Sequence, residues 1–226
     1  MNFNYEKNRA RKGAAWVIGC DEVGRGSLAG PVVAAAAVLP INRSEHQTLW
    51  KEIKDSKLLN SDKRSELSEF IKQYARWSVG VVSEKIIDKI NIHNATLLAM
   101  RRAVNSLIRH CEPQAKQSNK QIAILPSVVR NDMIIVVDGK FAIPNLLIPQ
   151  EAIVGGDNKI ISIAAASIIA KVYRDELMGR LHKAYPVYNF AKHKGYGTTE
   201  HCEAIVKHGL SPVHRLTFCS RIIPLP

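Results

Sequence analysis

The chain has few cysteines and no long apolar segment. Its 226 residues include 4 cysteines, none of them in a CxxC pair, and no signal peptide precedes the first apolar segment. This usage predicts free thiols in a reducing, cytoplasmic environment. No segment approaches the ~18 consecutive apolar residues of a membrane-spanning helix, so no membrane partner is expected. The chain also lacks an internal repeat.

The chain also has fewer acidic than basic residues. The 20 Asp and Glu residues face 32 Lys and Arg residues, which leaves a net charge of +12 and a pI near 9.7. Such a balance favours a polyanionic partner, with nucleic acid ahead of an anionic membrane surface, although a basic surface can also serve solubility alone. At this length, with 46% hydrophobic residues, we expect one domain with a single core, and a monomer. Residues 1–13 are polar and basic and predict a flexible arm.

The stretch from Val17 to Val33 is the most constrained part of the sequence. Its apolar start predicts a short buried strand, which places Asp21 and Glu22 where the strand leaves the sheet. The turn Gly24-Arg25-Gly26 follows, and its N–H groups and planar cation suit a phosphate or a sugar edge. The alternative is a surface turn that is merely acidic.

The rest of the chain predicts alternating strands and helices. Further strands are expected over 32–39, 77–82 and 133–137, the first of them forming a hairpin with the opening strand. Helices are expected over 62–74 after an N-cap at Ser61, in a short segment after Ser83, over 95–108, over 162–185, and from a cap at Thr199 to Gly209. Residues 112–132 are polar and predict an exposed insertion.

Two more acids follow apolar segments and adjoin glycine. Asp138 ends the strand over 133–137, and Asp157 follows Gly155-Gly156 just before a helix. If the strands are neighbours, Asp21, Glu22, Asp138 and Asp157 converge. A set of carboxylate oxygens suits hard divalent ions such as Mg²⁺ or Mn²⁺, and two such ions can hydrolyse a phosphodiester. The alternative is four unrelated structural acids in turns.

One geometric condition applies to the first pair. Consecutive residues of a regular strand point to opposite faces, so Asp21 and Glu22 should not serve the same ions unless the strand breaks there. A regular strand through Glu22 would exclude Glu22 as a ligand.

Other chemistries receive little support. The GRGSLAG segment has GxGxxxG spacing and leads into a second strand, which disfavours a dinucleotide site. The eight histidines form no HExxH motif, and no serine has a recognisable His and Asp arrangement.

Six motifs together resemble ribonuclease HII of the bacterial type over nearly the whole chain. They are DEVGRGSLAGPV (21–32), DSK (55–57), VDG (137–139), GD (156–157), SIAAASIIAKVYRD (162–175) and HKGYGT (193–198). The resemblance implies an α/β, RNase H-like fold in which helices flank a mixed β-sheet. The core would cover residues 14–185, and a helical C-terminal extension over 186–226 would help grip the duplex.

The resemblance also implies an activity. An enzyme of this family cuts on the 5′ side of ribonucleotides within duplex DNA, and RNA in RNA–DNA hybrids, leaving a 3′-hydroxyl and a 5′-phosphate. Asp21, Glu22, Asp138 and Asp157 would hold two Mg²⁺ or Mn²⁺ ions. Gly24, Arg25, Gly26 and Tyr196 would sense the ribose at the RNA-to-DNA junction, and Lys57 would meet a backbone phosphate, although it also suits a solvated helix entry.

The sequence departs from the family at two positions. Ser27 stands where proline is usual, which predicts a looser turn, and Gly155 stands where a lysine is common, which removes a positive charge beside Asp157. The related ribonuclease HIII family carries an extra N-terminal domain, which the short stretch before Asp21 does not match. A rival of another class is a catalytically silent nucleic-acid-binding module, but all four acids are present.

Overall fold

A five-stranded mixed sheet lies at the centre of the protein. The computed structural model describes residues 1–41, 46–111 and 132–223. The strands, in the spatial order β3-β2-β1-β4-β5, are β1 (Trp16–Val23), β2 (Val32–Val38), β3 (Arg76–Val82), β4 (Met133–Asp138) and β5 (Gln150–Ile153). β1, β2 and β3 pair antiparallel, whereas β4 is parallel to both β1 and β5. The predicted mixed sheet is confirmed.

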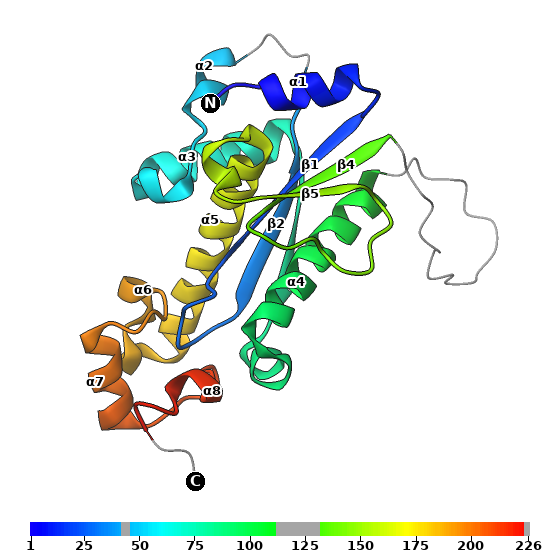
Figure 1. Ribbon diagram of the computed structural model, residues 1–226. Coiled ribbons are helices and arrows are strands. Elements are labelled where there is room, and N and C mark those ends of the chain that lie inside the picture. The colour runs from blue at the N-terminus through cyan, green and yellow to red at the C-terminus, as the bar shows by residue number, and fades with distance from the viewer. Residues whose placement is uncertain (42–45, 112–131, 224–226) are drawn as a thin grey trace, which may run out of the picture.

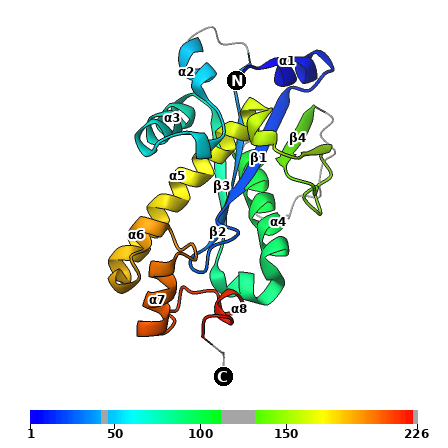
Figure 2. The same cartoon turned by 60° about the vertical axis from the view of Figure 1, so that its left-hand side comes forward.

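Helices cover both faces of this sheet (Figure 1, Figure 2). One core joins α4 (Glu84–Cys111) to the even-numbered residues of β1, and another joins α5 (Ile161–Ala184) and α3 (Ser61–Tyr74) to the opposite face. Glycine permits the close approach of α5, because a Cβ at Gly19 would lie 2.1 Å from the carbonyl carbon of Ser162. The α5 helix is therefore fixed directly over β1, where the site residues lie.

Most predicted helices are present, with small shifts at their starts. The caps are Asn60 for α3 and Thr198 for α7 (Thr199–His208), each one residue earlier than predicted. Asn91 interrupts α4 with a φ of 64°, which separates the short and long helices expected there. The short α2 (Gln47–Glu52) and strand β5 were not predicted.

The expected flexible arm is instead a docked helix. Residues Asn4–Arg11 form α1, and the buried Glu6 accepts a hydrogen bond from the backbone N–H of Ser162 in the first turn of α5. Tyr5 and Arg9 both bind the carboxylate of Glu151 in β5. The arm is helical and docked because Glu6, the one acid in this basic segment before Asp21, caps another helix. A local sequence pattern does not reveal such a contact.

Short helices follow α5 at the end of the molecule opposite α1 (Figure 1, Figure 2). They are η3 (Pro186–Tyr188), α6 (Phe190–His193), α7 and α8 (Leu216–Cys219), and they share a small core with Ala29 and Met178. Within residues 1–41, 46–111 and 132–223, no helix is long and apolar enough to cross a membrane. The insertion expected over 112–132 lies outside the described residues, apart from Asp132.

Candidate active site

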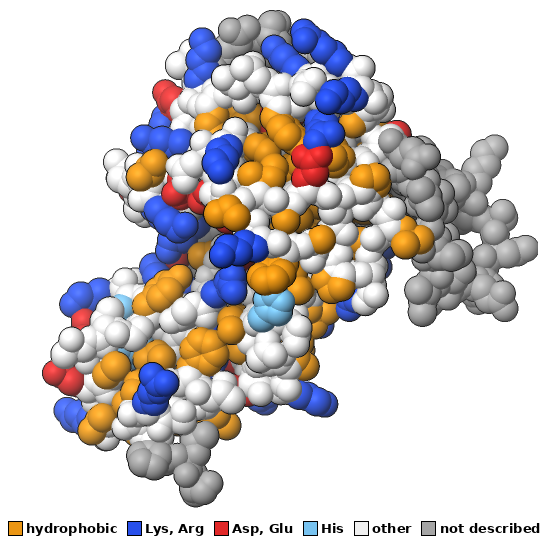
Figure 3. Space-filling model, in the orientation of Figure 1, with side chains coloured by type: hydrophobic (Ala, Val, Ile, Leu, Met, Phe, Trp, Pro, Cys, Tyr) orange, Lys and Arg blue, Asp and Glu red, His pale blue; other side chains and the backbone are white. Residues whose placement is uncertain are grey.

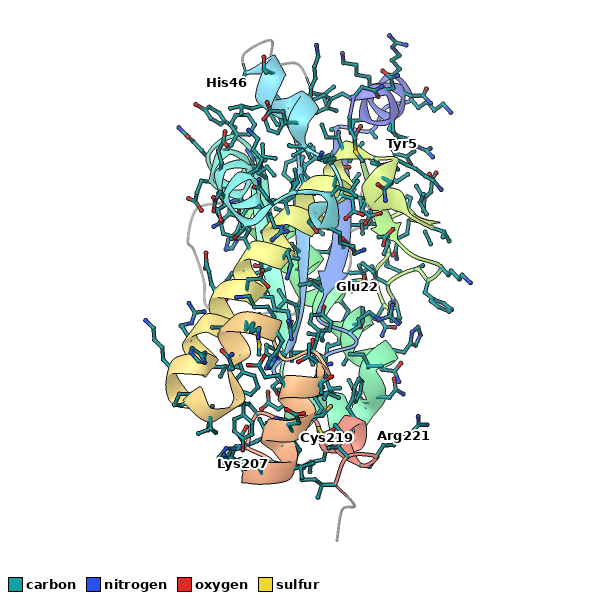
Figure 4. The ribbon with its side chains drawn as sticks, turned by 90° about the vertical axis from the view of Figure 1, so that its left-hand side faces the viewer. Tyr5, Glu22, His46, Lys207, Cys219 and Arg221 are labelled. Carbon is teal, nitrogen blue, oxygen red and sulfur yellow. The ribbon has the colours of Figure 1, made fainter. Side chains whose placement is uncertain are left out.

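The four predicted acids, here called the acidic cluster, come from adjacent segments. Asp21 and Glu22 lie near the end of β1, Asp138 ends the neighbouring parallel strand β4, and Asp157 lies in η2 (Gly156–Asn158). The last pair between β1 and β4 is Cys20 with Val137, so the chain positions that follow each of them carry acids side by side. Figure 4 shows Glu22 at this end of β1.

The expected break in the strand at Asp21-Glu22 does not occur. β1 continues to Val23 because β2 pairs with it as far as Val33, and Asp21 and Glu22 therefore face opposite sides of the sheet. Beyond Cys20, however, β1 has no strand neighbour on its β4 side among the described residues. Asp21 Oδ1 accepts a hydrogen bond of 2.7 Å from the N–H of Glu22, so its carboxylate turns to this open edge. Two residues on opposite faces cannot bind the same ions inside a sheet. At an open edge, however, both side chains can reach the same space.

Asp138 is the acid whose charge raises the pKa of each of the other three. Burial raises the pKa of Asp21 well above its usual value, and the charges of Glu22 and Asp138 raise it further. Burial also raises the pKa of Glu22 and of Asp157, and Asp138 adds to both shifts. The side chain of Asp138 itself is fixed by the N–H of Gly156, at 2.7 Å from Oδ1. The cluster is thus a group of repelling charges around one anchored carboxylate.

The acidic cluster suits divalent cations by its donor atoms. As the side chains stand, no three His, Cys, Asp or Glu residues of the described chain converge closely enough to hold a metal ion. Yet the donors are all carboxylate oxygens, Asp21 is only 5% exposed, and Glu22 Oε2 is buried without a hydrogen-bond partner. Hard cations prefer such oxygens, and a cation would relieve the repulsion. The residues present therefore fit Mg²⁺ or Mn²⁺.

Lys57 lies beside the acidic cluster, and its neighbours were missed from the sequence. Its Nζ lies 3.7 Å from Asp157 Oδ2, although the side chain is largely exposed, so it provides a positive charge where Gly155 lacks one. The buried Asp55 lies near Asp157 and raises the pKa of that residue. Ser56 Oγ lies 2.9 Å from Ser167 Oγ on α5, and Ser167 in turn lowers the pKa of Asp21. The DSK motif thus contributes all three of its side chains to this region.

Two buried arginines, here called the arginine pair, hold the glycine turn. Arg215 donates to the carbonyls of Gly24, Arg25 and Gly30, and Arg174 donates to those of Ala29, Pro31 and Lys194. Gly24 has a φ of 88°, and a Cβ there would lie 2.1 Å from Arg174 Nε. Burial lowers the pKa of both guanidiniums, to about 9 for Arg215, which leaves Arg215 charged at neutral pH.

The predicted sensor residues lie around this turn. Gly26 is open to solvent, Arg25 places Nη1 3.2 Å from Glu22 Oε1, and Tyr196 is 38% exposed. Tyr196 forms an isolated antiparallel bridge with Ser27. The turn and the aromatic residue are therefore direct neighbours, although 170 residues separate Gly26 from Tyr196 in the sequence.

Two histidines are hydrogen-bonded to each other, and one of them contacts the backbone of Tyr196. His201 Nδ1 lies 2.9 Å from the carbonyl oxygen of Tyr196, and His201 Nε2 lies 3.1 Å from His214 Nε2. Ser211 N–H donates to His214 Nδ1, so His214 carries its proton on Nε2 and donates it to His201. Burial lowers the pKa of His201, and that of His214 to about 4, so both rings are neutral at pH 7.

Strand order, flanking helices and acids at adjacent strand ends define a nuclease of the RNase H-like class. A family model described as ribonuclease HII matches residues 18–221. The ribonuclease HII of Caldanaerobacter subterraneus subsp. tengcongensis is 44% identical over 224 residues, covering 99% of this chain and 81% of that protein. That of Endomicrobium trichonymphae is 45% identical over 217 residues, covering 96% and 91%.

Solved structures agree with this assignment. Ribonuclease H2 from Pyrococcus horikoshii is 25% identical with a TM-score of 0.66, covering 92% of this chain and 96% of that one. RNase HII of Archaeoglobus fulgidus, solved in complex with PCNA, is 25% identical with a TM-score of 0.61, covering 89% and 94%. The chain belongs to the ribonuclease HII family, a family of endonucleases that act on RNA paired with DNA.

Proposed function

We propose that this protein hydrolyses the phosphodiester on the 5′ side of a ribonucleotide embedded in duplex DNA, and also cuts RNA in RNA–DNA hybrids. The observation that carries the proposal is the acidic cluster, in which Asp138 acts on three further carboxylates next to the glycine turn and Tyr196. The role that follows is the removal of ribonucleotides from DNA in the cytoplasm of the cell.

The acids would hold two divalent ions, Mg²⁺ or Mn²⁺. Bound ions of this kind activate the attacking water and stabilise the leaving oxygen of a phosphodiester. Water oxygen bonds to phosphorus while the P–O3′ bond breaks, so the upstream DNA keeps a 3′-hydroxyl and the ribonucleotide keeps a 5′-phosphate. Asp21, Glu22, Asp138 and Asp157 are the proposed ligands, and the N–H of Gly156 keeps Asp138 in place.

The substrate would lie across the cluster and the turn. Backbone groups of Gly24, Arg25 and Gly26 would approach a ribose 2′-hydroxyl, and the exposed ring of Tyr196 would stack on the next deoxyribose. Lys57 is exposed and can contact a phosphate. Lys and Arg side chains are spread over the face in Figure 3, and the net charge of +12 favours a polyanion. The helices over 186–226 would grip the duplex.

A cleavage assay tests the proposal. The protein is incubated with Mg²⁺ or Mn²⁺ and a DNA duplex that holds one ribonucleotide and a different label at each end. We expect a single cut 5′ to the ribonucleotide, with a 3′-hydroxyl on one product, and no cut in the matched all-DNA duplex. Binding of the duplex with no cut under either ion would favour the catalytically silent binding module instead.

A further inference from the structure

Arg174 joins the two halves of the proposed ribose sensor. It lies on α5 with no exposed surface and donates Nε to Pro31 O at 3.0 Å, beside the glycine turn, and Nη1 to Lys194 O at 2.9 Å, beside Tyr196. Its Cζ also lies 5.6 Å from the centroid of the Tyr196 ring. One guanidinium thus bonds to the chain that follows the turn and to the chain that precedes Tyr196, and it lies near the Tyr196 ring.

Ser27 gives this arginine a side-chain acceptor. The residue is fully buried, and its hydroxyl accepts a hydrogen bond of 2.9 Å from Arg174 Nη2. Its backbone forms the antiparallel bridge with Tyr196, and the next N–H, of Leu28, donates to Gly195 O at 2.8 Å. The looser turn expected from serine in place of proline is therefore offset, because proline has no side-chain oxygen that could accept this bond.

Neither arginine is neutralised by an acid. No ion pair between a carboxylate and either guanidinium occurs in the described part of the chain, and Arg174 binds only carbonyl oxygens and the Ser27 hydroxyl. Burying a charge is costly unless its N–H groups find acceptors, so the four acceptors of Arg174 are held in place together. The loss of one acceptor leaves a charged donor unsatisfied and frees the guanidinium to move.

We propose that Ser27 and Arg174 are positioning residues that set the ring of Tyr196 in register with the glycine turn, and so determine selectivity for a single ribonucleotide. The inference rests on the proposed function of Tyr196 as the group that stacks on a deoxyribose. At a lone ribonucleotide the next sugar is a deoxyribose, whereas inside a long RNA strand it is not. A displaced ring should therefore impair cleavage at single ribonucleotides more than cleavage of a long hybrid.

The test compares two serine variants that lose the same kind of bond. Ser27→Ala removes a buried hydroxyl from Arg174, and Ser78→Ala removes a buried hydroxyl bond to Ala103 O between β3 and α4, away from the turn. For Ser27→Ala we expect kcat/KM on the single-ribonucleotide duplex, divided by kcat/KM on a long RNA–DNA hybrid, to fall about tenfold, the scale of one charged hydrogen bond. Ser78→Ala should leave this ratio unchanged.

A second readout does not depend on activity. The NMR signals of the Tyr196 ring, assigned with Tyr196→Phe, should shift in Ser27→Ala and in Arg174→Lys, which keeps the charge but loses the planar fork. They should not shift in Ser78→Ala. Unchanged ring signals in Ser27→Ala would overturn the proposal, even if the variant were less stable.

The Tyr196→Ala variant distinguishes the sensor role of Tyr196 from the positioning role of Ser27. We expect it to lose the selectivity ratio, and we expect Ser27→Ala to cause no further loss in that background. If Tyr196→Ala loses selectivity while Ser27→Ala keeps it, the positioning role is wrong and the sensor stands. If Tyr196→Ala keeps the ratio, the sensor assignment fails, and the positioning role fails with it.

Discussion

The acidic cluster and the arginine pair are adjacent, and both contain buried charges of one sign. Their surroundings differ. The carboxylates repel one another, and Glu22 Oε2 has no hydrogen-bond partner, whereas the guanidiniums are directed to carbonyl and hydroxyl oxygens of the turn. Buried charge is costly in either case. Lys57 and Arg25 offset the acidic cluster only at Asp157 and Glu22, whereas each guanidinium of the pair has several acceptors within the chain. In the account proposed above, a bound cation would neutralise the remaining charge of the cluster, whereas the hydrogen bonds of the fold already satisfy the pair.

The largest effect is expected at the centre of the cluster. Asp138→Asn keeps the shape of the side chain but removes the charge that acts on the other three acids. Cleavage of the single-ribonucleotide duplex should fall by about a thousandfold or more, since ligands that act as a unit are not replaceable singly. Duplex binding, measured by fluorescence anisotropy, should persist. An active Asp138→Asn enzyme would contradict the two-ion proposal.

On the other side of the comparison, Arg215→Met should weaken the fold itself. The change leaves the carbonyls of Gly24, Arg25 and Gly30 without their donor, and we expect a loss of about 3 kcal/mol in the free energy of unfolding. Urea unfolding measures this loss. Arg221→Met in the same tail is the control, because Arg221 is exposed and should change stability by less than about 0.5 kcal/mol. Equal stabilities of the two variants would show that the hydrogen bonds of Arg215 do not stabilise the fold.

The buried histidines next to Tyr196 should make the stability of the protein depend on pH. The folded pKa of His214 is lowered from 6.5 to about 4, so the unfolded chain binds more protons between these values. Stability is therefore fully present above pH 6.5 and is lost as the pH falls towards 4, by on the order of 2 kcal/mol from this residue.

Urea midpoints at pH 7.5 and pH 5 measure the effect. His214→Gln should reduce the difference between the two midpoints. His110→Gln, at an exposed position of α4, should leave the difference as it is in the wild type. An unchanged difference in His214→Gln would mean that other groups cause the loss at acidic pH.

The smallest effect should have the opposite sign. Asp21→Asn removes a buried charge that repels Glu22 and Asp138, so the protein in a chelator should gain about 1 kcal/mol in stability, or a few degrees in Tm. Differential scanning calorimetry in a chelator measures the gain, with the exposed Glu176→Gln as the control. A loss of stability in Asp21→Asn would mean that the carboxylate is already satisfied by its neighbours.

The sequence predicted the acidic cluster because its signals are local. Each acid follows an apolar segment and has a glycine within two residues, and parallel pairing of β1 with β4 brings two of those segments together. The break expected at Glu22 was wrong because it depends on where β4 ends relative to β1, a property of strand register that no local pattern contains. Strand β5 was missed for a related reason, since its four residues QEAI show no continuous apolar character.

The arginine pair was missed, and one member of it could have been found. Ser167, Ala170, Arg174 and Met178 follow the 3.6-residue period along the buried face of α5, so a charge lies within an apolar stripe. Arg215 lies in a tail without periodicity, and only the fold brings it to a turn 190 residues earlier, as its bonds to Arg25 and Gly24 show. Ser27 is visible in the sequence as a departure from the family's proline, but its partner Arg174 lies on another element.

Cation binding is the most direct test of the difference between the two regions. Free Mn²⁺ is followed by electron paramagnetic resonance as it is titrated into the protein with an all-DNA duplex, which we expect not to be cut. We predict saturable binding of at least one ion per chain in the wild type and in Ser78→Ala, and its loss in Asp138→Asn. Equal binding by the wild type and Asp138→Asn would contradict the claim that the acidic cluster is completed by metal ions.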